Sequence, residues 1–326
     1  MADNTSAKKA SGNSFLKKLW SSQVFKVYLI MILLYVAACI VQPNYLSWDY
    51  INTLALMASI LGIIAIGQTM VILTGGIDMT IQYSLTLGVC LITAFDQDGK
   101  TIQGMILAVV ICTIIGFING LGISLIGIPA IIMTNAMNYI LKSVVNLYTT
   151  GTPRGVAPVA WKNFILTSYL GIKGGVWFWG LLAAIAIFLI SKTNYGRKLV
   201  AIGANRSVAN YSGINTKRVL ISVYTLSGMF IGFASWVAIG YRGRPFLSVG
   251  DGYDLMSVAS VVLGATSIMG GKGNYTGTIA GCLILQIVTA LLTTIQIEEA
   301  GKKVIYGVII LVVLLVYSLS ERKKKR

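Results

Sequence analysis

Residues 51–73 read INTLALMASILGIIAIGQTMVIL, a stretch that contains no charged side chain. Coiled as an α-helix, a run of this length crosses about 30 Å of bilayer hydrocarbon. The whole 326-residue chain has the same character, since 56% of it is hydrophobic, only 11% is charged and its mean hydropathy is +0.79. A water-soluble fold of this size could not cover so much apolar surface. Most of the chain is therefore expected to lie in a membrane.

About ten such apolar runs follow one another, separated by polar or glycine-containing breaks. The clearest are residues 24–41, 51–73, 101–125, 176–190, 219–240, 275–297 and 304–319. Three weaker runs, 81–95, 128–148 and 255–269, are short or polar, which is typical of broken or re-entrant helices inside a bundle. The sequence predicts an all-α polytopic membrane protein with about ten transmembrane helices. They form one domain over residues 24–320, between basic tails at residues 1–23 and 321–326.

Basic residues indicate the orientation. They lie at Lys8, Lys9, Lys17, Lys18 and Lys26 before the first run, and residues 322–326 read RKKKR after the last one. Because positive charge marks the cytoplasmic side, both termini are expected inside the cell and the number of spans is even. Ten spans then place residues 191–218 inside and residues 149–175 outside. The net charge of +16 is interpreted as a topology signal, with membrane lipid as a partner and no nucleic acid.

Several classes of chemistry are excluded by composition. The chain has no histidine, so a Ser-His-Asp triad or a His-ligated zinc is impossible. Cys39, Cys90, Cys112 and Cys282 all lie in apolar runs, which is typical of small hydrophobic side chains and not of a disulfide framework or metal site. No phosphate-binding loop of the type G-x-x-x-x-G-K-[ST] occurs. We therefore expect a transport protein that is not an enzyme, carries no cofactor, and is driven by a partner or an ion gradient.

The polar interval 191–218 contains six cations and no acid. Asn205 is a good N-cap, residues 206–212 provide about two turns, and Gly213 suits a left-handed position after a helix end. A helix this short needs tertiary or partner contacts to persist. Two interpretations stay open from the residues alone. The helix could dock a cytoplasmic partner, or it could lie on anionic headgroups, although Val208 and Tyr211 give it only a thin apolar face.

Three collinear motifs carry a resemblance to a known family. Residues 194–214 read NYGRKLVAIGANRSVANYSGI, residues 73–84 read LTGGIDMTIQYS, and residues 250–277 read GDGYDLMSVASVVLGATSIMGGKGNYTG. The first resembles the cytoplasmic coupling segment of the carbohydrate-type permeases of bacterial ABC importers, the family that carries ribose, xylose, arabinose and galactose. The second is similar to that family's TGGIDLSVGS motif, and the third to its GxGYELxAIAAVVLGGTSxxGGxGxxxG motif. The resemblance covers roughly residues 25–320.

The resemblance implies a multi-pass permease subunit of the bacterial cytoplasmic (inner) membrane. It implies three protein partners: a cytoplasmic ATP-binding subunit, a second permease subunit that is identical or related, and a periplasmic or lipid-anchored solute-binding protein. Cargo would cross by alternating access, with ATP hydrolysed by the partner. The coupling residues that it indicates are Gly203, Asn205, Arg206, Ala209, Ser212 and Gly213. A glutamate at Gly203 or Arg206 is then expected to uncouple ATP hydrolysis from uptake without unfolding the spans.

The other motif residues are assigned structural roles first. Paired glycines Gly75 and Gly76 break a helix where the chain turns, and Asp78 could cap the next segment. Asp254 is likewise expected to cap a helix start. A second glycine cluster permits a tight cytoplasmic turn and close approach of the following helix, and its members are Gly270, Gly271 and Gly273.

Polar groups inside membrane runs are candidates for the solute path because they are costly in hydrocarbon. Asn119, Asn135 and Asn138 are such groups, and the last two, three positions apart, are expected to share a helix face. Gln82 and Tyr83 stand where the resembling motif has Gly-Ser, which leaves the cargo open among pentoses, hexoses, cyclic polyols, nucleosides and a sugar-derived signalling molecule. Carboxamides suit a hydroxyl-rich cargo, since they donate and accept hydrogen bonds.

An ion-coupled secondary transporter of a small polar solute is the alternative function. Such carriers usually place acidic groups at mid-membrane, whereas no acid of this chain lies inside an apolar run, and Asp78 and Asp254 stand at run ends. A passive channel is a third possibility, which the coupling-like interval disfavours.

Overall fold

The computed structural model describes residues 22–97 and 99–325. The predicted basic tail over residues 1–23 lies outside the described residues except for its last two positions, as do Asp98 and Arg326. The elements in chain order are α2 (Gln23–Val41), η1 (Pro43–Leu46), α3 (Trp48–Leu73), α4 (Ile81–Gln97), α5 (Thr101–Leu121), η2 (Gly122–Ile126), α6 (Ala130–Thr149), α7 (Val159–Leu166), β1 (Ser168–Tyr169), β2 (Ile172–Lys173), α8 (Gly174–Lys192), α9 (Asn194–Ala204), α10 (Arg206–Tyr211), α11 (Thr216–Arg242), α12 (Tyr253–Leu263), α13 (Tyr275–Thr294) and α14 (Glu299–Lys325).

The all-α membrane fold that the sequence predicts is confirmed. Each of the ten predicted apolar runs has most of its residues on a different helix, and these helices are α2, α3, α4, α5, α6, α8, α11, α12, α13 and α14. Among the described residues, six helices are long and apolar enough to cross a membrane: α2, α3, α5 with its continuation η2, α8, α11 and α13. The four cysteines are buried free thiols, as small hydrophobic side chains should be.

Local details differ from the predictions in four places. The weak run 128–148 is not broken, because α6 continues without interruption for 20 residues. The run 255–269 is helical only as far as Leu263, after which the backbone turns through residues 264–274. The sequence did not predict α7, α9 or the antiparallel β1–β2 hairpin. The predicted tail at residues 321–326 continues α14 as helix to Lys325.

Helix α3 forms the centre of the bundle. Of its most apolar 18 residues, 94% are buried, whereas the corresponding figure for α2 is 17%. The α3 N-terminus is capped by Ser47, whose hydroxyl accepts from the backbone N–H of Tyr50 at 3.3 Å. Around α3, helices α5 and α11 share the most extensive contact and cross through glycines: a Cβ at Gly228 would lie 2.1 Å from the carbonyl oxygen of Cys112. Small residues of this kind let two membrane helices approach at backbone distance.

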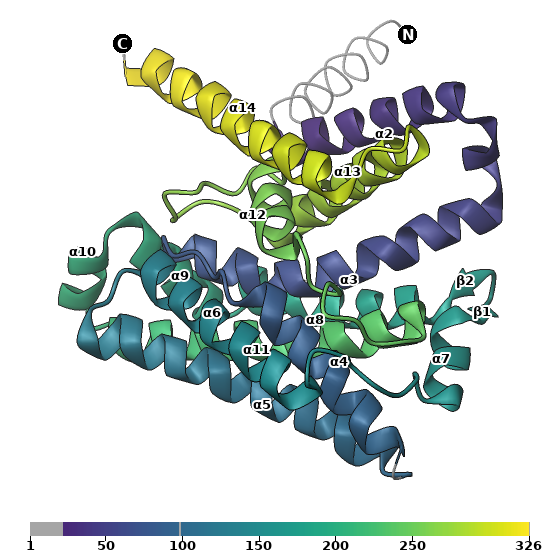
Figure 1. The fold of residues 1–326 in the computed structure, drawn as a ribbon. Coiled ribbons are helices and arrows are strands. Elements are labelled where there is room, and N and C mark those ends of the chain that lie inside the picture. The colour runs from purple at the N-terminus through teal and green to yellow at the C-terminus, as the bar shows by residue number, and fades with distance from the viewer. Residues whose placement is uncertain (1–21, 98, 326) are drawn as a thin grey trace, which may run out of the picture.

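The connecting segments gather at two opposite ends of the bundle, with α9 and α10 at one end and α7 with the β1–β2 hairpin at the other (Figure 1). At the α10 end, the Gly271 N–H donates to the Leu73 carbonyl at 3.0 Å and the Ser124 hydroxyl to the Lys217 carbonyl at 2.9 Å. At the hairpin end, the Trp48 indole donates to the Gly171 carbonyl at 2.9 Å. This sorting agrees with the predicted alternation of inner and outer segments, and the α10 end is the one predicted to be cytoplasmic.

Candidate functional site

Helix α6 presents an exposed polar stripe. Asn135, Tyr139, Lys142 and Asn146 are exposed and follow one another at spacings of four, three and four residues, which puts them on one helix face. The neighbouring exposed face is apolar and includes Ile140. Polar side chains within a membrane helix face other protein or a water-filled space. The stripe therefore belongs against a partner chain or an aqueous path, and the apolar face belongs against lipid.

The first turn of α4 lies beside this stripe. The backbone N–H of Tyr83 donates to Asn138 Oδ1 at 3.2 Å, and Asn138 is the ninth residue of α6, about 12 Å along the helix axis. The amide of the adjacent Gln82 donates from Nε2 to Asp251 Oδ1 at 2.7 Å. The other carboxylate oxygen of Asp251 lies 3.6 Å from the ammonium group of Lys303 on α14.

We group the α6 stripe with the side chains at the first turn of α4 and those bound to them under the name polar face. Its residues, from α6, α4, the segment before α12 and α14, are Gln82, Tyr83, Asn135, Tyr139, Lys142, Asn146, Asp251 and Lys303. The Asp251 side chain is 33% exposed and that of Lys303 is 41% exposed, so both reach solvent in the isolated chain.

The five residues predicted to line a solute path divide into two groups. Gln82, Tyr83 and Asn135 belong to the polar face. Asn138 is buried and holds the start of α4, and Asn119 is fully buried with its amide 3.4 Å from the Thr80 hydroxyl. Asn135 and Asn138, three positions apart, are neighbours on the helix surface, but Asn135 is exposed and Asn138 is buried, so they meet different surroundings.

Residues 74–80 form a non-helical break between α3 and α4 that is tied to α11 by a carboxylate. Asp78 is fully buried; its Oδ1 accepts from the Thr80 N–H at 3.0 Å, and its Oδ2 accepts from the Ser227 hydroxyl at 2.8 Å. The Thr80 hydroxyl also donates to Asp78. The carboxylate thus stabilises the turn before α4 and does not cap α4 directly. Buried irregular backbone at membrane depth requires such internal partners.

Asp254 and the glycine motifs take structural positions. Asp254 lies in the first turn of α12, where a carboxylate favours the positive helix end. Gly75 has φ +83°, which matches the helix break expected at the Gly75–Gly76 pair. In the second cluster, Gly270 and Gly271 have φ +84° and +72°, and Gly273 has φ +153°, so the turn after α12 uses backbone conformations that favour glycine.

At the α10 end, the predicted short helix is confirmed as α10. Asn205 caps it by accepting from the Val208 N–H at 3.0 Å, and Gly213 has φ +82° just beyond its last turn. Only Ala209 is buried, which anchors α10 to the bundle, while the Val208 side chain is 58% exposed and that of Tyr211 is 90% exposed. Ser212 is exposed at the C-cap. Helix α10 therefore projects from the end of the molecule (Figure 1).

Helix α9, which precedes α10, connects it to the core. Thr193 caps α9 through the Tyr195 N–H at 3.1 Å, and Leu199 and Ile202 are buried. Burial raises the pKa of Tyr195, and the hydrogen bond to the Ser222 hydroxyl at 2.9 Å acts in the opposite direction.

Gly203 of α9 packs against both glycine turns. A Cβ at Gly203 would lie 1.9 Å from the Leu73 carbonyl oxygen and 2.4 Å from the Gly271 nitrogen. The expectation that a glutamate at Gly203 leaves the spans intact is therefore wrong, because these neighbours are backbone atoms that cannot move aside. Arg206 has no such constraint, since its side chain is exposed. A chain of contacts thus runs from α10 through α9 to the break at residues 74–80 and on to Gln82.

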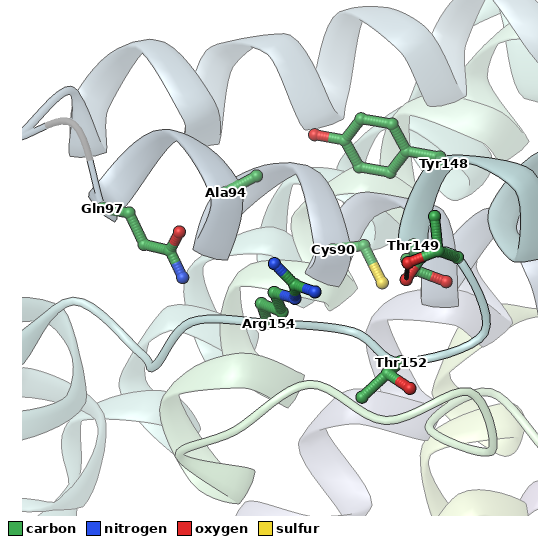
Figure 2. Close-up of a pocket in the computed structure, with 8 residues that line it drawn as sticks. Cys90, Ala94, Gln97, Tyr148, Thr149, Thr152 and Arg154 are labelled. Carbon is green, nitrogen blue, oxygen red and sulfur yellow. Dashed lines mark hydrogen bonds between the residues drawn. The ribbon is translucent and has the colours of Figure 1, made fainter.

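Two pockets open elsewhere. One, of about 380 Å³, lies between α4, the end of α6 and the loop that follows; Figure 2 shows Gln97, Ala94 and Cys90 of α4 on one side, with Tyr148, Thr149, Thr152 and Arg154 around them. The other, of about 420 Å³, contains three cations, Lys162, Arg242 and Arg244. Both are formed by residues at the hairpin end, away from α10, and the first one is built from the same two helices, α4 and α6, that meet at the polar face.

Residues 50–314 match the family described as branched-chain amino acid transport system / permease component. The chain belongs to this family. It is 28% identical to the ribose import permease protein RbsC of Escherichia coli (strain K12), covering 94% of this chain and 97% of the relative. It is 31% identical to the ribose import permease protein RbsC of Bacillus subtilis (strain 168), covering 91% of this chain and 92% of the relative. It is 30% identical to the autoinducer 2 import system permease protein LsrC of Salmonella choleraesuis (strain SC-B67), covering 92% of this chain and 86% of the relative.

These comparisons confirm the resemblance to carbohydrate-type ABC importer permeases, and with the apolar helices they identify a multi-pass protein of the bacterial cytoplasmic membrane. No solved structure matches this chain. Sequence reasoning did not assign five residues of the polar face of this permease to the solute path, namely Tyr139, Lys142, Asn146, Asp251 and Lys303. The spacing of Tyr139, Lys142 and Asn146 from Asn135 could have revealed the stripe, whereas nothing local links Asp251 to Lys303.

Proposed function

We propose that this permease imports a sugar or sugar-like solute by alternating access, driven by a separate ATP-binding subunit that grips α10. The observation that carries the proposal is the exposed α10 with its continuous route of contacts into the bundle. Its exposed Tyr211 and Val208 offer a partner an apolar contact that the chain itself does not use. Buried aromatic anchors of this kind provide much of the affinity in protein interfaces.

The route supports a mechanical role for α10. Force on α10 would pass through Asn205 to α9, and from Gly203 to the turns at Leu73 and Gly271, which are within backbone contact. The break at residues 74–80 follows at once, and it positions Gln82 and Tyr83 on the polar face. Non-helical breaks of this sort mark the solute site in many transporters. A small rotation of α9 would therefore rearrange the polar face while the α3 core stays packed.

Sugar cargo is favoured by the chemistry of the path and by the relatives. The polar face offers three amides, a carboxylate, two phenols and two ammonium groups, which together donate to and accept from hydroxyl groups. The pocket between α4 and α6 is lined by hydroxyl and amide side chains and lies toward the predicted outer side. We infer that a second permease copy or a related chain covers the α6 stripe, and that a solute-binding protein delivers cargo at the hairpin end.

Charge reversal at Arg206 tests the coupling. Arg206→Glu, made in the permease co-expressed with its ATP-binding subunit, is expected to lower solute uptake into proteoliposomes at least tenfold, because it puts an acid on a docking helix that has none.

Tyr211→Ala should lower uptake and co-purification of the ATP-binding subunit without changing the thermal unfolding midpoint of the permease, since the Tyr211 side chain is 90% exposed.

Arg218→Glu is the matched control for Arg206→Glu. It reverses the same charge at the same end, but on the first turn of α11, where an acid favours the helix. Uptake by Arg206→Glu equal to that of Arg218→Glu would refute docking through α10. Uptake by the purified permease alone, driven by an ion gradient without ATP, would support the secondary carrier instead. Labelling that places Asn205 outside the cell would also overturn the proposal.

A further inference from the structure

The cluster formed by Gln82, Asp251 and Lys303 lies beside the first turn of α4, which contacts the middle of the membrane helix α6, and it is open to solvent. Tyr83, next to Gln82, is bonded to Asn138 about midway along α6. The segment that carries Asp251 is pressed against the same turn, because a Cβ at Gly250 would lie 1.9 Å from the Gln82 carbonyl oxygen. A charged pair at this depth that the chain leaves one-third or more exposed must meet water, solute or another protein.

The carboxylate of Asp251 has acceptor capacity to spare. A carboxylate offers about four lone-pair sites. The described residues use one of them for the Gln82 amide at 2.7 Å, and Lys303 stands off at 3.6 Å, beyond a strong hydrogen bond. The described residues thus hold the carboxylate in place through Gln82 while leaving its exposed side accessible to a ligand.

The chemistry that fits these groups is a pair of adjacent hydroxyls. Two neighbouring hydroxyl groups can donate to the two oxygens of one carboxylate, and they can accept from the ammonium of Lys303 and the amide of Gln82. We propose that Asp251, flanked by Gln82 and Lys303, is the residue through which this permease recognises adjacent hydroxyl groups of its solute. The inference rests on the solute path of the proposed function and specifies its recognition chemistry.

Gln82 makes the site particular to this chain. The resembling motif has glycine at this position, and a glycine carries no amide to hold Asp251. Replacing Gln82 by glycine is therefore expected to leave the backbone in place while freeing the carboxylate. Gln82 is thus a positioning residue, and Asp251 contacts the solute.

Direct binding measurements test the proposal. The full-length permease is purified in lipid nanodiscs without other subunits, and saturation-transfer NMR is recorded with D-ribose, D-galactose, ribitol, adenosine and L-leucine. Wild type is expected to bind at least one of the four hydroxylated probes in preference to leucine. Asp251→Asn should weaken that binding at least tenfold, because it removes the charge that strengthens both hydrogen bonds. Gln82→Gly should change the affinity by less, while altering which probe is preferred.

Asp49→Asn is the matched control, because Asp49 also pairs with a lysine, Lys173 at 3.5 Å, but at the hairpin end and with an 87% exposed side chain. Its probe binding should equal that of wild type.

Three results would overturn the proposal: equal binding by wild type and Asp251→Asn, leucine competing with the hydroxylated probes, or no binding of any of the four hydroxylated probes by wild type. Thermal unfolding identifies a misfolded Asp251→Asn, and Lys303→Met, expected to weaken binding at least threefold, then provides the second test. Neither ATP nor a partner enters this assay, so its failure is distinct from failure of the coupling experiment.

Discussion

Gly228→Val is expected to abolish folding of the permease, with a loss of at least about 3 kcal/mol in the free energy of unfolding. Gly228 stands where α11 crosses α5, and its added Cβ would lie 2.1 Å from the Cys112 carbonyl oxygen and 3.2 Å from the Gly116 Cα. The obstacle is helix backbone, so no side chain can rotate away to make room. Because α5 and α11 share the most extensive helix contact in the bundle, separating them would disturb the α3 core as well.

Gly180→Val provides the matched control for this prediction. Gly180 is also inside an apolar helix, α8, but apart from its own stretch of helix no atom lies within 4 Å of its added Cβ. Valine is a better helix former than glycine, so this variant should be neutral or slightly stabilised. Both variants are compared by the yield of monodisperse protein in detergent and by the thermal unfolding midpoint. A Gly228→Val protein that melts like Gly180→Val would show that α5 and α11 do not approach at backbone distance.

The sequence predicted the helices well because their determinants are local. Hydrocarbon thickness sets the length of each apolar run, so the ten runs fall on ten helices. The limits of α10 were equally predictable, since Asn205 and Gly213 act within one turn of the residues that they cap or terminate. The sequence of α9 carried the same kind of signal in Thr193, whose hydroxyl accepts from the next residues, but it was overlooked.

The site was less predictable because it depends on how distant helices meet. Gln82 and Asp251 are 169 positions apart, and no local pattern specifies the register between α4 and the segment before α12. Gly203 illustrates the same difficulty. A glutamate at this position was expected to leave the spans intact, whereas Gly203 packs against two turns that are remote in sequence. The polar stripe of α6 is intermediate, since its spacing is local but its exposure follows from what α4 covers.

The break at residues 74–80 depends on one carboxylate. Asp78→Ala is expected to destabilise the permease by roughly 3 kcal/mol or more, because it leaves the Thr80 N–H and the Ser227 hydroxyl buried without an acceptor, at about 1–3 kcal/mol for each. Uptake should be lost with stability, since the same break carries Gln82 and Tyr83 to the polar face. The measurement is the thermal unfolding midpoint in detergent, followed by uptake in proteoliposomes for any variant that folds.

Asp78→Asn separates the loss of hydrogen bonds from the loss of charge. The asparagine Oδ1 can still accept from Thr80, and its amide can donate to the Ser227 oxygen once that hydroxyl turns. We therefore expect Asp78→Asn to melt close to wild type and to keep most of its uptake. Asp49→Ala is the control for the alanine variant, since an exposed ion pair contributes less than about 1 kcal/mol. If Asp78→Ala melted no lower than Asp49→Ala, the carboxylate could not be what holds the break against α11, and the route from α10 to the polar face would lose its central link.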